Sequence, residues 1–185
     1  MLQTSTGDPI SPIRFTAYVL IIACSVVLIY LFGFRGMRFF LVPSGSMEPT
    51  LFPGDYLITL TECPYRRGEI VVLKDPEQKG AYIVKRIVAV PGDRVAIEGG
   101  ALMLNGKYAS EPYIPEPMAV DLDPIQVGAN EVFVLGDNRN ESEDSSVWKR
   151  AVGLDTVIGR VRCIYYPFSR MGLARRFPLT NSEGE

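Results

Sequence analysis

An apolar run without charge or proline occupies residues 15–34 and sets the first limit on how this chain folds. As an α-helix it would rise about 1.5 Å per residue to ~30 Å, the thickness of the hydrocarbon core of a bilayer. A cleavable signal peptide has a shorter apolar region and ends in small residues, whereas this run ends at Phe34. A helix buried in a protein core is the alternative, but such helices rarely lack all charge over this length. We expect a transmembrane anchor over residues 15–34, after a short disordered lead over residues 1–14.

The charges that flank this run leave its orientation open. Arg14 precedes the run, and Arg35 and Arg38 follow it. A bare count under the positive-inside rule would keep the larger part of the chain in the cytoplasm. The difference is a single residue, however, and long domains cross membranes largely regardless of flanking charge.

Short apolar runs separated by turn sequences follow from residue 39 onward. Pro-Gly-Asp recurs at residues 53–55 and 91–93, while Gly-Gly at 99–100 and Asn-Gly at 105–106 fit tight hairpins. No window carries a sustained helical period, so we expect a mainly β fold, an antiparallel sandwich or partly open barrel. This domain covers residues 35–177, with a proline-rich surface loop at 112–124 and a disordered tail at 178–185. The expected strands cover residues 39–42, 56–60, 69–73, 82–90, 94–97, 101–104, 131–135 and 158–166.

The composition argues against several kinds of site. The net charge is −2 with Lys and Arg scattered along the chain, so no basic face for nucleic acid is indicated. Cys24, Cys63 and Cys163 lie far apart and the chain contains no histidine, so we expect neither a metal site nor a cofactor. A disulfide between Cys63 and Cys163 stays open, because sequence does not show whether the two side chains meet.

Ser44, Gly45 and Ser46 are the first candidates for chemistry. A serine hydroxyl is a poor nucleophile and needs a base within hydrogen-bond reach. Because the chain contains no histidine, that base cannot be imidazole. Ser44 offers a second hydroxyl to donate to a developing oxyanion. The alternative is a flexible Ser-Gly-Ser linker, which is common in loops.

Lys85 is the second candidate. Strand alternation places Ile83, Lys85 and Ile87 on one face of the expected strand. A lysine among isoleucines is desolvated, which disfavours its charged form and lowers its pKa, as a lysine general base requires. The alternative is an edge-strand lysine whose stem packs on apolar surface while its ammonium group reaches water.

A polar loop at residues 136–145 is the third candidate, directly after the expected strand at 131–135. A loop this polar is either solvated surface or a scaffold beneath an active site. Arg139 can pair with a carboxylate through two hydrogen bonds. Ser142 is short enough to hydrogen-bond a neutral lysine amine and hold it in place.

Three motifs together resemble those of bacterial type I signal peptidases, the Ser-Lys peptidases of family S26. They are PSGSMEPTL at residues 43–51, VKRIVAVPGD at 84–93 and GDNR at 136–139. Each motif is weak alone, but together and in this order they are specific, and the likeness extends over residues 15–167. The resemblance implies a membrane-bound serine endopeptidase that removes signal peptides from preproteins after an A-x-A-like site. It also implies a single-pass protein of the plasma or inner membrane, with the catalytic domain on the extracytoplasmic side.

The resemblance also implies roles for individual residues. Ser46 is the nucleophile, Lys85 is the general base, and the N–H of Ser46 with the hydroxyl of Ser44 forms the oxyanion hole. Ser142 orients Lys85. The loop is braced by Asp137, Arg139 and Asp144, and substrate contacts Phe40, Val42, Met47, Leu51 and Val84.

The chain departs from the family pattern in three places. Asn140 and Glu141 precede Ser142 where the family has Asp-Asn, and Ser146 stands where an arginine usually pairs with the residue equivalent to Asp144. The segment at residues 98–130 is short, which predicts a reduced hairpin and loop in place of a larger subdomain.

Two other functions remain to be distinguished. One is another Ser-Lys peptidase, either membrane-tethered or of the self-cleaving repressor type. A repressor-type protein would carry no anchor and would contain its own cleavage segment. A membrane-tethered β module that binds peptides would keep the strands but would not need Ser46 and Lys85 together. Nothing in the sequence specifies an oligomeric state.

Overall fold

The computed structural model describes residues 12–33 and 36–179, and it divides the chain into two compact units, residues 1–35 and 36–185. In the first unit, α1 spans Pro12–Gly33 and begins with a proline, which is favoured at the first helical position. In the described part of the chain, no helix is long and apolar enough to be identified as a membrane span. The anchor expected over residues 15–34 is therefore not confirmed. Of the expected disordered lead, residues 12–14 are helical and residues 1–11 lie outside the described part.

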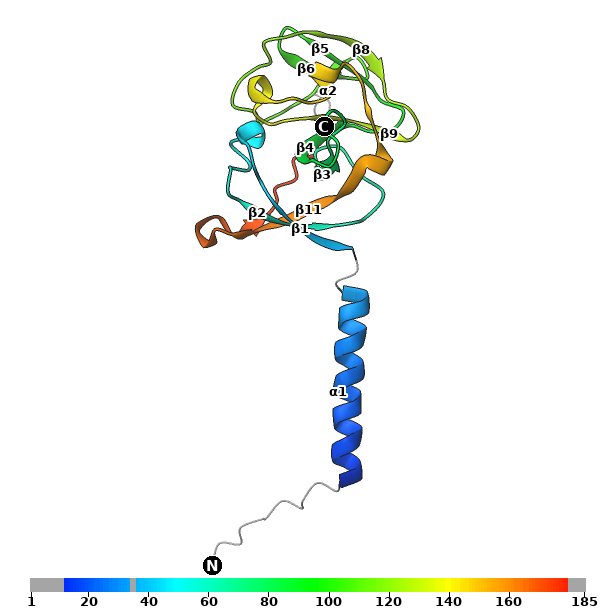
Figure 1. Cartoon of the computed structure of the whole chain (residues 1–185). Helices are drawn as coiled ribbons and strands as arrows, with labels where there is room; N and C mark the ends of the chain where they lie inside the picture. The colour runs from blue at the N-terminus through cyan, green and yellow to red at the C-terminus, as the bar shows by residue number, and fades with distance from the viewer. Residues whose placement is uncertain (1–11, 34–35, 180–185) are drawn as a thin grey trace, which may run out of the picture. The chain divides into compact units, whose positions relative to one another are not determined.

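The second unit consists mainly of antiparallel strands in two sheets (Figure 1). The eight-stranded sheet has the order β1-β2-β11-β3-β4-β9-β10, with β12 paired to β11, and the four-stranded sheet has the order β7-β6-β5-β8. In the large sheet the strands are β1 Met37–Leu41, β2 Tyr56–Leu60, β3 Ile70–Lys74, β4 Tyr82–Ala89, β9 Glu131–Leu135, β10 Val152–Gly153, β11 Val157–Tyr166 and β12 Gly172–Leu173. In the small sheet they are β5 Arg94–Glu98, β6 Ala101–Leu104, β7 Lys107–Tyr108 and β8 Leu122–Gln126. The mainly β, antiparallel fold expected from the sequence is confirmed.

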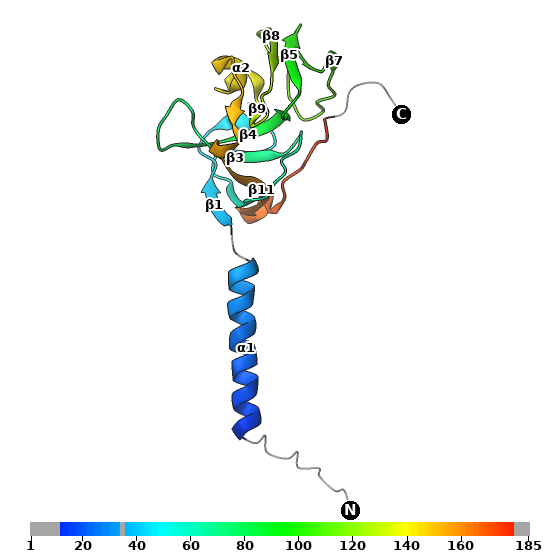
Figure 2. The ribbon, with the colours of Figure 1, turned by 90° about the vertical axis from the view of Figure 1, so that its right-hand side faces the viewer.

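Short helices connect these strands. The 3-10 turns are η1 Gly45–Met47, η2 Arg139–Glu141, η3 Leu154–Thr156 and η4 Phe168–Arg170, and α2 spans Ser145–Trp148. Figure 2 shows β5, β7 and β8 on one side of the unit and β3, β4 and β11 on the other. Ser46 lies on η1, Lys85 lies on β4 and Ser142 lies between η2 and α2, so three separate segments contribute to one site.

The proline-rich segment at residues 112–124 differs from the surface loop expected there. Tyr113 and Met118 are each 5% exposed and pack into the hydrophobic core beneath the small sheet. The segment then enters β8, which pairs with β5 at the edge of that sheet, where a strand tolerates Pro124. Turn-forming prolines hid this strand, because its stability comes from tertiary packing rather than from local propensity.

Two further expectations are corrected. Leu179 is 6% exposed and joins the same core cluster, so the tail expected to be disordered from residue 178 is ordered at its start. Residues 180–185 lie outside the described part. Cys63 and Cys163 are both free thiols, so the disulfide left open by the sequence is not formed.

The core that supports the site is a cluster of buried apolar side chains between β1, η1, β2, β3, β4 and β11. The cluster comprises Val42, Met47, Leu51, Leu57, Ile70, Val72, Val84, Val161 and Ile164.

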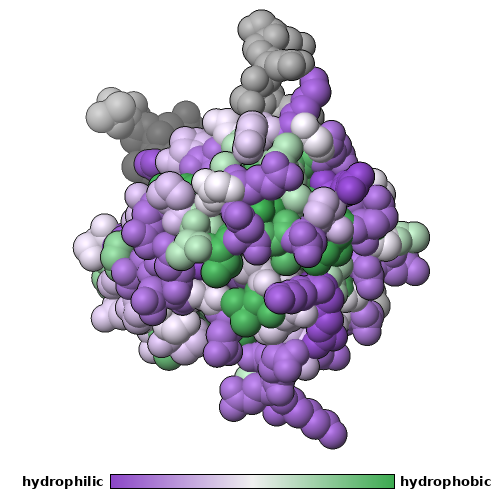
Figure 3. Space-filling view, turned by 90° about the horizontal axis from the view of Figure 1, so that it is seen from above, coloured by the Kyte–Doolittle hydropathy of each residue, from purple (hydrophilic) through white to green (hydrophobic). Residues whose placement is uncertain are grey.

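The surface of the molecule, seen from above, is largely hydrophilic, with hydrophobic residues showing between polar ones near its middle (Figure 3).

Candidate active site

Ser46 lies on η1, a turn that is held by the apolar packing of Met47 and by hydrogen bonds from the polar loop at residues 136–145. Met47 is 1% exposed and anchors the turn in the core. The backbone N–H of Asn138 donates to Ser46 O at 3.1 Å, and Asn138 Nδ2 donates to Gly45 O at 3.3 Å. Two segments distant in the sequence are therefore joined where Ser46 presents its hydroxyl.

Lys85 reaches Ser46 from β4. Its Nζ lies 2.9 Å from Ser46 Oγ and donates to Ser142 Oγ, also at 2.9 Å. The side chain is 3% exposed, as the strand alternation predicts. Burial lowers the pKa of Lys85 below its ordinary value, against the opposing effect of the nearby carboxylates of Asp144, Asp75, Glu143 and Asp137. A lysine in this setting is poised to accept a proton from Ser46.

Ser142 accepts a second hydrogen bond from Lys85. The Ser142 hydroxyl donates to Asp144 Oδ2 at 2.6 Å, which leaves its oxygen free to accept from Lys85. With one N–H directed at Ser142, the lone pair of a neutral amine can be directed at Ser46. The order Asp144, Ser142, Lys85, Ser46 is thus a continuous chain of hydrogen bonds.

Asp144 is fully buried, yet its carboxylate has donors on both oxygens. Oδ1 accepts from the backbone N–H of Ser146 at 3.0 Å and from its hydroxyl at 2.7 Å, while Oδ2 accepts from the N–H of Gly136 at 2.9 Å. Asp144 is also the N-cap of α2. Ser146, which replaces the arginine of the family pattern, therefore supplies two of the hydrogen bonds that a buried carboxylate needs.

Gly136 is required where the loop passes closest to the site. A Cβ atom there would lie 2.3 Å from Ser142 Oγ and 2.5 Å from Ser46 O. Any larger residue would push apart the two segments that carry Ser46 and Ser142.

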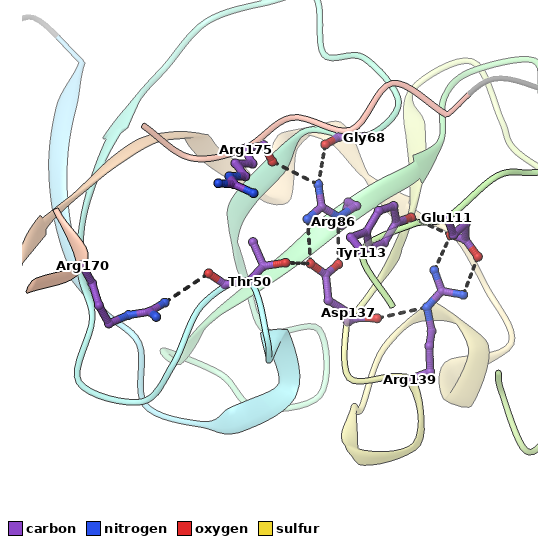
Figure 4. A network of polar contacts seen from close by, with 10 residues as sticks. Thr50, Gly68, Arg86, Glu111, Tyr113, Asp137, Arg139, Arg170 and Arg175 are labelled. Atoms are coloured by element: carbon purple, nitrogen blue, oxygen red, sulfur yellow. Dashed lines mark hydrogen bonds and ion pairs between the residues drawn. The ribbon is translucent and has the colours of Figure 1, made fainter. Parts of the chain in front are cut away.

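Asp137 braces the loop through Arg86, which the sequence analysis did not assign (Figure 4). Arg86 Nε and Nη2 donate to the two oxygens of Asp137 at 2.8 and 2.6 Å, and both side chains are fully buried. Thr50, which follows η1, donates its hydroxyl to the same carboxylate at 2.5 Å. Strand alternation offered a signal, since an arginine between Val84 and Val88 on an apolar face needs a buried carboxylate as partner.

A cavity of about 240 Å³ opens beside Ser46 and Lys85. Val42, Met47 and Val84 line it, as the resemblance implies. Leu51 and Phe40 do not line it, because Leu51 is buried in the cluster behind it and Phe40 packs against that cluster. A larger cavity of about 520 Å³ borders Thr50 and Leu51 but is lined by neither Ser46 nor Lys85.

Ser44 also lines the smaller cavity, and its side chain makes no capping hydrogen bond to η1. The first N–H groups of a helical turn have no acceptor within the turn, so the N–H of Ser46, near the start of η1, is also available to donate a hydrogen bond. Both donors can therefore serve a substrate oxygen. Across residues 12–33 and 36–179, no group of three or more acidic or cysteine side chains is placed to hold a metal ion.

Comparison with known proteins gives one family. The family model described as "Signal peptidase, peptidase S26" matches residues 13–166. A signal peptidase I of Bacillus licheniformis is 31% identical over 91% of this chain and 96% of its own length. A probable signal peptidase I of Synechocystis is 39% identical over 71% of this chain, and the match spans 64% of that relative.

A crystal structure of a signal peptidase I from Enterococcus faecalis is 27% identical with a TM-score of 0.47, covering 54% of this chain and 97% of that one. The family match extends from α1 to the end of β11 and includes every element that carries the site. The chain belongs to the signal peptidase family, peptidase S26.

Proposed function

We propose that this chain is a serine endopeptidase that removes N-terminal signal peptides from preproteins, with Ser46 as nucleophile and Lys85 as general base. The observation that carries the proposal is the 2.9 Å contact between Lys85 Nζ and Ser46 Oγ in a buried setting. A peptide-binding module would have no need for this contact. A self-cleaving peptidase would present a segment of its own chain at Ser46, whereas the smaller cavity beside Ser46 is open to an added peptide.

The reaction follows from the positions of these groups. Neutral Lys85 takes the proton of the Ser46 hydroxyl as Oγ attacks the scissile carbonyl carbon, and the carbonyl oxygen becomes an oxyanion. The N–H of Ser46 and the hydroxyl of Ser44 stabilise that oxyanion. Lys85 then gives its proton to the departing amine, which breaks the peptide bond and leaves an ester on Ser46. Lys85 then takes a proton from a water molecule as the water oxygen attacks the ester carbon. The bond to Ser46 Oγ breaks, and Lys85 returns that proton to Oγ, which releases the carboxyl product and restores the free enzyme.

The specificity of the site follows from its two strands. β1 pairs only with β2 and is an edge of the large sheet, while residues 83–85 of β4 pair with β3 and precede the part of β4 that pairs with β9. Phe40 and Tyr82 bring β1 and β4 together, with ring centroids 5.4 Å apart. An extended substrate would add as a strand at these edges and place alternate side chains in the cavity.

We predict that the enzyme accepts small side chains at the first and third positions before the cut. Val42, Met47 and Val84 are each at most 6% exposed and belong to the packed core behind the cavity, so the cavity wall cannot easily move back to admit a longer side chain. A peptide library that varies the residue before the cut would measure this. Alanine and glycine should be cleaved at least tenfold faster than leucine, since a misfitting side chain costs 1–3 kcal/mol or about 10- to 200-fold. Preference for leucine or phenylalanine would contradict the assignment of the cavity.

We further propose that α1 attaches the chain to the cell membrane as a single pass, with the catalytic domain on the extracytoplasmic side. The support is the set of large apolar side chains along α1, which are 49–69% exposed and would be costly to leave in water. The full chain should co-sediment with phospholipid vesicles, and a variant carrying Leu20→Arg and Val27→Arg should stay in the supernatant. Ser46→Ala, which leaves α1 unchanged, is the control. Equal sedimentation of all three proteins would contradict the proposal.

A further inference from the structure

Arg139 is tied to a part of the chain that lies outside the three motifs. It is 3% exposed, its Nε donates to Gly136 O at 3.1 Å, and its guanidinium pairs with both carboxylate oxygens of Glu111, Nη1 with Oε2 at 2.8 Å and Nη2 with Oε1. Glu111 directly precedes the proline-rich segment at residues 112–124 that was expected to be a surface loop. A buried arginine needs such a partner, because an uncompensated buried charge is strongly destabilising.

Tyr113 connects this pair to the second buried arginine. Its hydroxyl donates to Glu111 Oε1 at 2.5 Å, and Arg86 Cζ lies 4.2 Å from the centre of its ring. Burial raises the pKa of Tyr113, so its hydroxyl stays protonated and remains a donor. Arg86 in turn holds Asp137 through two hydrogen bonds.

These contacts form a ring that runs Arg139, Glu111, Tyr113, Arg86 and Asp137 (Figure 4). The ring closes through the backbone, because Asp137 and Arg139 are the two neighbours of one residue, Asn138. That residue donates its N–H to Ser46 O, and three residues beyond Arg139 the chain reaches the serine that holds Lys85.

The proline-rich segment that follows Glu111 contacts the polar loop at a second residue, Asn140. Asn140 Nδ2 donates to Glu116 Oε1 at 2.8 Å and to Pro117 O at 3.1 Å, and Asn140 Oδ1 accepts from the N–H of Ala119 at 2.8 Å. Residues 111–119 therefore hold η2 at two adjacent residues, Arg139 and Asn140.

We propose that Glu111 and Tyr113 are positioning residues of the active site, acting through Arg139 and Arg86 to hold the loop that orders both Ser46 and Lys85. The inference rests on the proposed function and adds two residues to it. Loss of either contact lets the loop move away from Ser46 and from the amine that Ser142 orients. Misplacement by about 1 Å in a catalytic site costs on the order of 100-fold in rate.

A loosened loop has a consequence that simple destabilisation lacks. The segment that carries Ser142 contacts the amine of Lys85 and partly shields it from water. Burial is the main reason that the pKa of Lys85 is lowered. When water reaches the amine, the pKa rises toward its ordinary value, while Asp144, Asp75, Glu143 and Asp137 still favour the charged form. The acid limb of kcat/KM then moves to higher pH.

The test uses the full chain in detergent with a preprotein that carries an A-x-A site. Glu111→Gln removes the charge but keeps the shape, and Tyr113→Phe removes only a hydroxyl. We expect kcat to fall about 10- to 100-fold in Glu111→Gln and about fivefold in Tyr113→Phe, with KM little changed and the acid limb at higher pH in both. The double variant should be no slower than Glu111→Gln, because the Tyr113 hydroxyl acts through Glu111. Glu77→Gln breaks an exposed pair with Arg150 and is the matched control.

Three outcomes would overturn the inference. The first is a kcat loss that only follows the folded fraction, with the acid limb unmoved. The second is an activity for both variants equal to that of the control. The third is a double variant whose losses multiply. If Glu111→Gln does not fold, Tyr113→Phe decides alone through its acid limb. Wild-type enzyme that fails to cleave the preprotein would instead contradict the proposed function and would not bear on Glu111 or Tyr113.

Discussion

Ser46→Ala is expected to abolish cleavage, while Ser44→Ala is expected to leave a slow but measurable rate. Ser46 Oγ is the atom 2.9 Å from Lys85 Nζ, and loss of a serine nucleophile costs on the order of 10⁶-fold in kcat. Ser44 lines the cavity without a capping bond and is one of the two proposed oxyanion donors. Loss of one such donor costs about 10²–10³-fold in kcat.

Single-turnover cleavage of an A-x-A preprotein measures both losses on the same scale. Thr50→Ser keeps the hydroxyl that donates a hydrogen bond to Asp137, and it serves as a control for a conservative change near η1. An active Ser46→Ala protein beside an inactive Ser44→Ala protein would mean that the two serines have the opposite roles. Equal, complete losses would mean that the hydroxyl of Ser44 does more than stabilise the oxyanion.

Lys85→Met is expected to be inactive and yet at least as stable as wild type near pH 7. Methionine matches the length of lysine without its charge, so it fills the same buried space and cannot accept a proton. In the folded protein burial lowers the pKa of Lys85, whereas in the unfolded chain the pKa takes its ordinary value. The charged form is thus less favoured in the folded state.

The sign of the pH dependence follows from this difference. Above the unfolded pKa both states hold neutral lysine and folding loses nothing. As the pH falls from the unfolded pKa to the folded one, the free energy of unfolding decreases by about 1.4 kcal/mol for each pH unit between them, and below the folded pKa the loss is complete. Methionine avoids the loss at pH 7.

Thermal melts of the two full-length proteins in detergent measure this comparison. A variant that is inactive and clearly less stable than wild type would mean that Lys85 is charged and paired in the resting enzyme. The general-base role would then have to be withdrawn.

The parts of the site that lie in short sequence motifs could be predicted from local patterns. Ser46 and Lys85 each belong to a motif whose residue types match a chemical task, Ser142 lies in the polar loop that begins with the third motif, and alternation in a strand predicts the burial of Lys85. The structure brings the three within hydrogen-bond distance. Six of the eight strands of the large sheet were similarly recognisable, because β-branched runs bounded by turn residues indicate strands directly. The two-residue strands β10 and β12 were not expected, because they are too short to show a pattern.

The supporting contacts could not be read in this way, because they join segments far apart in the sequence. Glu111 and Arg139 are 28 residues apart, and Arg86 and Asp137 are 51 apart. Nothing local to Glu111 distinguishes it from a solvated acid before two prolines. The pairing of Glu111 with Arg139 becomes apparent only in the structure, where Tyr113 is buried and the proline-rich segment continues into β8.

The pH dependence of single-turnover kcat/KM, measured for wild type and for Asp75→Asn, tests most directly whether neutral Lys85 is the base. Burial lowers the pKa of Lys85 and the carboxylate of Asp75 partly opposes this effect. Asparagine keeps the Oδ1 that accepts from the N–H groups of Glu77 and Gln78 while removing the charge. We predict a single acid limb below the ordinary pKa of lysine, shifted to lower pH in Asp75→Asn. A rate that does not rise with pH, or a limb that Asp75→Asn leaves in place, would contradict it.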